Sequence, residues 1–258
     1  MTYSLMGGGK RFRPVLTLLA AESVGGAPED ILPVACAIEL IHTYSLIHDD
    51  LPAVDNDDLR RNRPTCHVRF GEAVAIMAGD ALFAEAFWLI SHRQKGAAPD
   101  INWVVRELSE ATGMRGMVGG QVRDIESSCR RPDKELLRYI HEHKTGRLIS
   151  VAARCGAKLG GATEVQMAAI GEYAAELGLA FQVVDDILDV SGQPGLIGKN
   201  VGADESLEKL TFPAVYGLQR SRVLAAEAVG RAKSSLNAAG LQPSALCELA
   251  DFVLERDS

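Results

Sequence analysis

The sequence predicts an all-α protein, and three features support this fold class. Hydrophobic residues make up 47% of the 258 residues, enough to bury a large core, whereas aromatic residues make up only 5%. Alanine, leucine and glutamate are plentiful, which favours helices over a β-sandwich or barrel. Apolar residues recur at three- and four-residue steps, and no run has the period of a strand. We therefore expect a single domain over residues 1–258, with a central helix surrounded by others.

Glycines and prolines divide the first half of the chain into helices. Pro14 suits the first turn of a helix that runs to about Val24, and Pro33 could open the next one, which Pro52 perturbs. A long apolar helix follows, which we expect to be the central one, and then a helix softly interrupted by the glycines of GMRGMVGG. The predicted helices are 14–24, 33–48, 71–92 and 100–128.

Capping residues mark the helices of the second half. Asp133 and Glu135 lie near the positive end of a helix, where carboxylates are favourable. Thr163 and Gln166 have the spacing of a capping box. The clearest loop covers residues 191–204. The predicted helices are 133–158, 163–190, 212–239 and 245–254.

The charge distribution excludes one class of partner and indicates another. A formal net charge of -7 argues against a nucleic-acid-binding protein, which needs excess Lys and Arg. The basic residues nevertheless cluster at 7–14 and 60–64, which suits a small anionic ligand. Lys10, Arg11 and Arg13 follow three glycines that let backbone approach a phosphate closely. Arg60 and Arg61 offer planar forks that match phosphate oxygens.

The cysteines and the apolar runs bear on the compartment. There are five cysteines, an odd number without a CxxC pair, which favours a reduced cytoplasmic location. We find no apolar run that we interpret as a membrane span and no signal peptide.

The second acidic cluster along the chain, FQVVDDILDV at residues 181–190, predicts a metal site. Asp185 and Asp189 are four residues apart, so they share one helix face, and they lie among apolar residues. Like charges at that spacing cost helix stability, by roughly 0.2–0.5 kcal/mol even when exposed. A divalent cation would remove the repulsion, and carboxylates favour Mg²⁺, which joins one or two of them to substrate phosphates.

The first acidic cluster along the chain, residues 48–61, contains five aspartates before two arginines. Asp49 and Asp55 would point about 120° apart in an unbroken helix. Pro52 lies between them, and a local bulge there could bring Asp55 back beside Asp49. The alternative interpretation is a solvated helix end, which we adopt only for Asp57 and Asp58.

Nine motifs, in matching order and spacing, resemble a known family. The sequence is similar over nearly its whole length to the trans-type short-chain isoprenyl diphosphate synthases of the polyprenyl synthetase family, and most similar to the bacterial farnesyl type. The motifs are GGGKRFRP, ELIHTYSLIHDDLPAVDNDDLRR, PTCHVRFGEA, AGDALFAEAF, GGQVRD, HKTGRL, FQVVDDILDV, GKNVGAD and KLTFP.

The resemblance implies helices around a deep apolar cavity, with the two acidic clusters facing each other at its mouth, and a homodimer. It implies three Mg²⁺ ions when substrate is bound, with metal ligands among Asp49, Asp50, Asp55, Asp185, Asp186 and Asp189. An allylic diphosphate would be held by Arg60, Lys144, Thr145, Gln182 and Lys199. Isopentenyl diphosphate would be held by Lys10, Arg13, His42 and Arg61, with Lys209 supporting the loop nearby. Taken alone, His42 would be interpreted as a core histidine.

The implied reaction is an ionisation followed by a condensation. The allylic carbon–oxygen bond breaks as cations stabilise the departing diphosphate, and the double bond of isopentenyl diphosphate attacks the allylic cation. The catalytic residues would be Asp49, Asp55, Asp185, Arg60, Lys144 and Lys199. The released diphosphate takes the proton in this family, so no protein base is assigned.

Product length is expected to depend on Tyr44 and its neighbour Ser45, five and four residues before Asp49. In the family a bulky aromatic at the position of Tyr44 accompanies fifteen-carbon products, and smaller residues accompany twenty or more. Farnesyl diphosphate is therefore the expected product, although Tyr44 could instead be ordinary core packing.

Two departures from the family pattern stand out. Asn62 replaces the usual glycine after the paired arginines, and asparagine tolerates positive φ better than most residues. Relatives also carry one or two more helices before GGGKR, and their absence is expected to expose apolar surface.

Three other functions stay open: a longer-chain synthase, a class I terpene cyclase, and a non-catalytic partner subunit.

Overall fold

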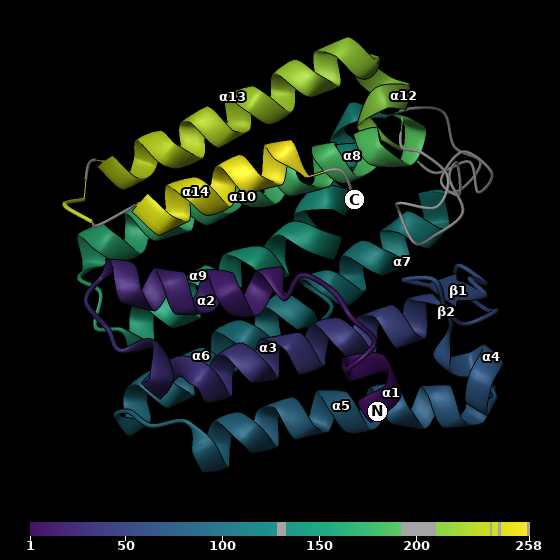
Figure 1. Cartoon of the computed structure of the whole chain (residues 1–258), viewed down its shortest axis with the longest axis horizontal. Coiled ribbons are helices and arrows are strands. Elements are labelled where there is room, and N and C mark those ends of the chain that lie inside the picture. Colours follow the sequence, from purple (N-terminus) through teal and green to yellow (C-terminus); the bar gives the residue numbers. More distant parts are fainter. Residues whose placement is uncertain (128–132, 192–209, 238, 242–243, 257–258) are drawn as a thin grey trace.

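The computed structural model is almost entirely helical, which confirms the all-α prediction (Figure 1). It describes residues 1–127, 133–191, 210–237, 239–241 and 244–256. The helices are α1 (Thr2–Leu5), α2 (Phe12–Ser23), α3 (Pro28–Asp49), α4 (Cys66–Phe70), α5 (Glu72–Arg93), α6 (Ala98–Thr112), α7 (Met117–Ser127), α8 (Lys134–Ile140), η1 (His141–Gly146), α9 (Arg147–Leu159), α10 (Glu164–Ser191), α12 (Phe212–Tyr216), α13 (Leu218–Asn237) and α14 (Ser244–Glu255). Two short strands, β1 (Leu59–Arg60) and β2 (Arg63–Pro64), form a hairpin.

Helix α10 lies at the centre of the fold, so the prediction that the helix over 71–92 is central is wrong: that helix is α5, which packs mainly against α3 and α4. Helix α10 packs against α9, η1, α12, α13 and α14, while α3 packs against α2, α5 and α9. In Figure 1 α13 and α14 lie along one side of the molecule, α3 and α5 along the other, and α2 and α9 between them. The Tyr173 hydroxyl, buried on α10, donates a hydrogen bond of 2.7 Å to the Leu246 carbonyl of α14. The core therefore joins the C-terminal helix to the centre of the fold.

The capping predictions are confirmed. The Thr163 and Gln166 side chains each bond the other's backbone N–H, at 2.9 and 3.3 Å, just before α10 begins. The Asp133 carboxylate accepts from the Glu135 and Leu136 N–H groups at the start of α8. Both ends are determined by adjacent residues, which is why the sequence predicts them.

The predicted start of α3 is wrong. The helix begins at Pro28, and Pro33 lies inside it. Gln94, from the end of α5, bridges the hydrogen bond interrupted beside the proline. Its side chain accepts from the Val34 N–H at 3.1 Å and donates to the Asp30 carbonyl at 2.8 Å. A distant side chain thus lets the helix continue through the proline.

Other boundaries also differ from the prediction. Residues 100–127 contain two helices, since α6 ends at Thr112 and α7 begins at Met117. The helix predicted over 133–158 contains a π-helical turn, His141–Gly146, a feature often found at functional sites. The β1–β2 hairpin and the short α1 were not predicted.

The absence of a membrane span is not confirmed. Three helices are long and apolar enough to cross a membrane by length and composition: Pro28–Asp49, Glu72–Arg93 and Glu164–Ser191. α3 and α10 bury 56% and 50% of their most apolar window within the fold, whereas α5 buries 33%. The apolar character of α3 and α10 therefore serves largely to pack the bundle interior.

Candidate functional site

The first acidic cluster begins where α3 ends. The Asp55 N–H donates to the Asp49 carbonyl at 2.9 Å, and the Asn56 N–H donates to the Leu51 carbonyl at 3.1 Å. These bonds curl the chain after Pro52 and return the backbone of Asp55 to that of Asp49. A turn that ends the helix replaces the predicted bulge and brings the two residues together.

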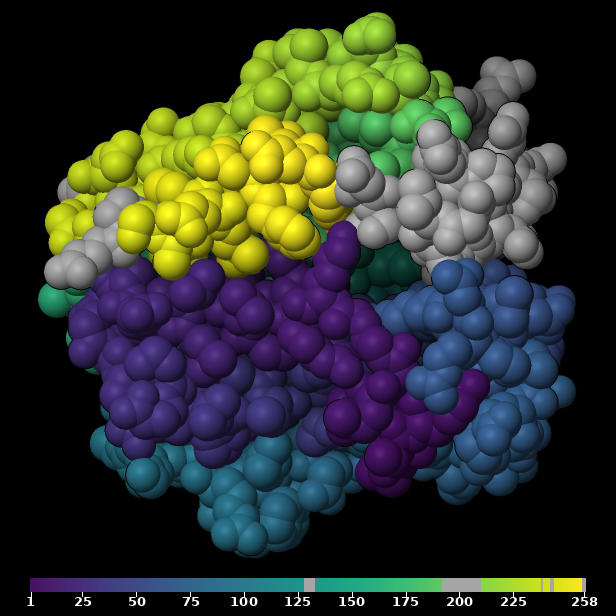
Figure 2. Space-filling view, in the orientation of Figure 1, coloured from purple at the N-terminus to yellow at the C-terminus, as the bar shows by residue number. Residues whose placement is uncertain are grey.

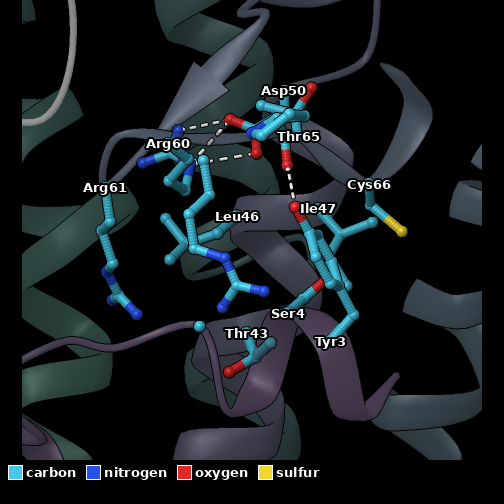
Figure 3. Close-up of a pocket in the computed structure, with 13 residues that line it drawn as sticks. Tyr3, Ser4, Thr43, Leu46, Ile47, Asp50, Arg60, Arg61, Thr65 and Cys66 are labelled. Atoms are coloured by element: carbon cyan, nitrogen blue, oxygen red, sulfur yellow. Dashed lines mark hydrogen bonds and ion pairs between the residues drawn. The ribbon is translucent and has the colours of Figure 1, made fainter. Parts of the chain in front are cut away.

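Asp50, the neighbour of Asp49, is buried and paired with Arg60 of β1 (Figure 3). Its carboxylate accepts from the Arg60 Nε–H at 2.7 Å and lies 2.5 Å from Nη2. Asp57, expected to be solvated, lies 3.7 Å from the same guanidinium. The fork of Arg60 therefore faces carboxylates within the protein, and the placement of Asp50 favours an ion pair over a metal ligand.

The β1–β2 hairpin fixes the direction of Arg61. Arg61 and Asn62 both have positive φ, 54° and 59°, as a two-residue type I′ turn requires. The expectation that Asn62 tolerates this conformation is confirmed. Arg61 extends away from the Asp50–Arg60 pair in Figure 3 and donates to the Gly8 carbonyl. A Cβ at Gly9 would lie 2.5 Å from the guanidinium of Arg61, so this contact requires a glycine.

His42 lies within a group of four arginines, Arg11, Arg13, Arg60 and Arg61, which we call the arginine cluster. Burial lowers the pKa of His42 well below 6.5, and all four arginines lower it further. Arg13 is itself buried, and this burial lowers its pKa to about 10 although Glu39 and Asp185 oppose the shift. A neutral histidine among guanidiniums can donate to an anion without needing a counter-charge of its own.

Lys144, in the π-helical turn, connects to the first acidic cluster. Its ammonium donates to the buried Asp124 of α7 at 2.6 Å. Burial alone lowers the pKa of Lys144, but the charges of Asp124, Asp49 and Asp55 outweigh it and raise the pKa. Lys144 is therefore a fixed cation close to Asp49 and Asp55.

The carboxylates of the second acidic cluster lie in contrasting surroundings on α10. The Asp185 side chain is 60% exposed. Asp186 is buried, accepts from the Gln182 amide at 2.9 Å and from the Phe212 N–H at 2.8 Å, and lies 3.6 Å from His141 Nε2. Asp186 thus joins α10 to α12 and η1, whereas Asp185 is accessible to a ligand.

The π-helical turn lies near both acidic clusters. His141 is buried, and this burial lowers its pKa to about 4, although the charges of Asp124 and Asp185 oppose the shift.

In Figure 2 a hollow opens between α14, the N-terminal segment and the hairpin, with teal mid-chain residues at its floor. Lys199 and Lys209 lie outside the described residues, and Thr145 is half-buried on η1.

Within the described part of the chain, no three His, Cys, Asp or Glu side chains converge as a metal cluster. The exposed carboxylate of Asp185 and the half-buried Asp49, Asp55 and Asp189 are hard oxygen donors on α3, on the turn that follows it and on α10. This donor set fits Mg²⁺ held by a few carboxylates together with substrate phosphates, and it does not fit an all-protein cage.

A family model described as Polyprenyl synthetase matches residues 1–239. The chain belongs to the polyprenyl synthetase family.

Family members with different product names are equally similar to this chain. A farnesyl diphosphate synthase from Geobacillus stearothermophilus is 46% identical over 259 residues, which cover 100% of this chain and 87% of the relative. A chloroplastic geranylgeranyl pyrophosphate synthase from Capsicum annuum is 46% identical over 261 residues, covering 100% and 71%. A Helicobacter pylori geranyltransferase, solved with magnesium and isoprenyl diphosphate, is 33% identical with a TM-score of 0.87, covering 98% and 85%.

Several residues of this polyprenyl synthetase site were not predicted as site residues. Asp124 ends the GGQVRD motif and His141 lies two residues before HKTGRL, but nothing local shows that they meet Lys144 and Asp186. Arg256 follows the C-terminal helix; its side chain is 5% exposed, lies 3.9 Å from the Phe181 ring centroid and 3.3 Å from the Asp185 carboxylate. These contacts join segments far apart in sequence, so no local pattern reveals them.

Proposed function

We propose that this prenyltransferase condenses an allylic diphosphate, dimethylallyl or geranyl, with isopentenyl diphosphate, and that its product is farnesyl diphosphate. The observation that carries the proposal is the coexistence of an arginine cluster around His42 with two acidic clusters near Lys144. An enzyme that condenses two prenyl diphosphate substrates needs two sites for diphosphate groups, one of them suited to metal ions. The farnesyl diphosphate synthases among the relatives support the same reaction class.

The reaction breaks one carbon–oxygen bond and forms one carbon–carbon bond. The allylic diphosphate leaves with the bonding electron pair, and the double bond of isopentenyl diphosphate attacks the allylic carbon. A proton is then lost, so the products are the longer prenyl diphosphate, inorganic diphosphate and a proton. Lys144 stays protonated because its pKa is raised, and it provides a positive charge where the leaving group gains negative charge.

Asp49, Asp55 and Asp185 are the metal ligands that the placement favours, with Asp189 on the same face of α10 as Asp185. Bound Mg²⁺ would neutralise the diphosphate and favour its departure. Asp50 and Asp186 instead position Arg60 and the start of α12. The number of ions, expected to be three, is part of the proposal.

The substrate-binding residues divide between the two sites. Gln182, Thr145 and Lys144 lie on α10 and η1, on the acidic side, and would hold the allylic diphosphate with Arg60. Lys10, Arg13, His42 and Arg61 would hold isopentenyl diphosphate. Lys199 and Lys209, outside the described residues, are proposed on the family motifs alone.

An aromatic row supports a fifteen-carbon limit. Tyr44 is buried, and its ring lies 5.0 Å from that of Phe83, which lies 5.2 Å from that of Phe87. Burial, followed by the charge of Asp49, raises the pKa of Tyr44 to about 12, so the phenol lies near the first acidic cluster and stays neutral. We propose that this row ends the space for the growing chain. The Ser45 hydroxyl donates a hydrogen bond of 3.0 Å to the His42 carbonyl and so supports the turn of α3 that contains Tyr44.

An exposed apolar face supports a homodimer. Val74, Ile76, Met77 and Trp88 of α5 are each 39–61% exposed, as are Val68 and Phe70 of α4. Such a face on a long helix is characteristic of a subunit interface.

The four described cysteines are free, which supports the proposed cytoplasmic location.

Incubation of the purified protein with Mg²⁺, dimethylallyl diphosphate and labelled isopentenyl diphosphate tests the function. We expect incorporation into a fifteen-carbon product, and Tyr44→Ala should lengthen that product to twenty carbons or more. A twenty-carbon product from the unaltered protein would indicate a longer-chain synthase. Release of diphosphate without isopentenyl diphosphate would indicate a cyclase, and no turnover would indicate a partner subunit.

A further inference from the structure

Glu39, on α3, is the buried carboxylate next to the arginine cluster. It is 6% exposed and lies one helical turn before His42. Its carboxylate accepts a hydrogen bond of 2.5 Å from Arg11 Nη1, and its charge raises the pKa values of Arg13 and Arg61 against the opposing effect of burial. A carboxylate here works against anion binding by charge alone, so its presence requires another explanation.

Arg11 connects Glu39 to the glycine loop, Gly7–Gly9. While Nη1 binds Glu39, Nη2 donates to the Leu5 carbonyl at 2.5 Å, at the end of α1. Arg11 also has left-handed backbone geometry, with φ 52°, directly before α2. That conformation is unfavourable for arginine and persists only where surrounding contacts hold it.

The glycine loop in turn holds Arg61. Gly8 and Gly9 have φ of 101° and 109°, a conformation that favours glycine. The Gly8 carbonyl accepts from Arg61, and the missing side chain of Gly9 makes room for the guanidinium. The connection therefore runs from Glu39 through the Arg11 side chain to Leu5, then along the backbone through the glycine loop to Arg61.

We propose that Glu39 is a positioning residue for the isopentenyl diphosphate site. Through Arg11 it fixes the glycine loop, and the loop places Lys10, Arg13 and Arg61 for one diphosphate group. The benefit of ordering these cations before binding exceeds the Coulomb cost of one buried carboxylate. The inference rests on the proposed function, since it assigns the ligand of the cluster.

Positioning and charge predict effects of opposite sign. If Glu39 were only a nearby negative charge, Glu39→Gln would tighten diphosphate binding. If it positions Arg11, the same change weakens binding, because a charge-assisted hydrogen bond becomes a neutral one. Glu39→Asp keeps the charge but shortens the reach, so positioning predicts weaker binding in that variant too.

The test is the dissociation constant of isopentenyl diphosphate, measured by calorimetry in metal-free buffer containing EDTA. We expect an increase of about tenfold in Glu39→Gln and Glu39→Asp, the loss of one charge-assisted bond. Glu29→Gln removes an exposed carboxylate from the same helix and should leave the constant within about twofold. In an Arg11→Gln background, Glu39→Gln should add little, because it acts through Arg11.

Unchanged or tighter binding in Glu39→Gln would overturn the proposal, as would wild-type binding in Glu39→Asp or full additivity with Arg11→Gln. Absence of binding to the unaltered protein would overturn it as well. Circular dichroism before each titration confirms that the variants are folded, and Gln, equal in size to Glu, disturbs the packing least. Failure of the unaltered protein to incorporate label while it still binds isopentenyl diphosphate would reject the proposed reaction and leave this inference standing.

Discussion

The arginine cluster around His42 and the acidic clusters near Lys144 differ in how far the protein alone assembles them. The four arginines and His42 come together with Glu39 as an internal counter-charge. On the acidic side, no three carboxylates converge within the described residues, and Asp50 and Asp186 are bound to other protein groups. The basic site is preorganised, whereas the acidic site depends on what binds to it.

This difference suits the order of the chemistry. Isopentenyl diphosphate keeps its diphosphate throughout the reaction, so a rigid site can bind it from start to finish. The allylic substrate loses its diphosphate, so its site must stabilise a charge that develops during the reaction. Metal ions bound together with that substrate would meet this need, because a ready-made protein cage would instead hold the free ions tightly.

The largest expected effect is on turnover, from Asp185→Ala. We expect kcat to fall about a thousandfold, because the variant lacks the exposed carboxylate that we propose as a metal ligand. Affinity for isopentenyl diphosphate in metal-free buffer should stay within about threefold, because the arginine cluster is intact. Steady-state kinetics and calorimetry measure the two quantities, with Glu172→Ala on the same helix as the control.

Full turnover in Asp185→Ala would refute the role of Asp185 as a metal ligand. An equal loss of isopentenyl diphosphate affinity would show that the two sites are a single unit.

The next largest effect is on stability, from Asp124→Asn. Lys144 would lose its buried partner, and breaking such a pair costs about 3–5 kcal/mol of unfolding free energy. Urea denaturation measures this loss. Glu126→Gln, which breaks the exposed pair with Arg123 on the same helix, should cost less than about 1 kcal/mol. Equal losses in the two variants would mean that Lys144 does not depend on Asp124.

Acid should destabilise the protein through His141. Its pKa is about 4 in the folded protein and 6.5 unperturbed, so the unfolded chain takes up the proton first as pH falls. The stability it contributes is complete above pH 6.5 and is lost as the pH falls toward 4, by about 2 kcal/mol at pH 5. Urea denaturation at pH 7 and pH 5 should therefore show a smaller loss in His141→Gln than in the unaltered protein. The exposed His92→Gln should behave like the unaltered protein, and an identical loss in all three would contradict this explanation.

The smallest effect separates His42 from the buried His141. Burial and then the arginines lower the pKa of His42, so a bound diphosphate that neutralises the arginines should raise that pKa. His141 lies among carboxylates and Lys144, and in metal-free buffer its pKa should change less. Histidine resonances followed by NMR, with and without isopentenyl diphosphate, test the difference. Equal shifts would show that the ligand does not select the arginine cluster.

The sequence predicts those features that depend on adjacent residues. The capping box of Thr163 and Gln166, the shared face of Asp185 and Asp189, and the tolerance of Asn62 for positive φ all follow from local rules. The convergence of His42 with the arginines follows from motifs whose spacing matches a family.

The sequence cannot predict features that depend on contacts between distant segments. The helix continues through Pro33 because Gln94, sixty residues away from Val34, bridges the interrupted hydrogen bond. Asp50 and Asp186 look like their neighbours in sequence, yet burial directs one to Arg60 and the other to the Phe212 N–H. Whether an aspartate faces solvent or a protein partner is a property of packing.

The most direct test of this account is calorimetry with two ligands, each measured with EDTA and with Mg²⁺. The ligands are isopentenyl diphosphate and an allylic thiolodiphosphate, an analogue whose bond to the allylic carbon does not break. A preorganised basic site predicts that isopentenyl diphosphate binds about equally well under both conditions. An acidic site completed by its ligand predicts that the allylic analogue binds at least about a hundredfold more tightly with Mg²⁺. Tight metal-free binding of the allylic analogue, or an isopentenyl diphosphate affinity that disappears with EDTA, would contradict the account.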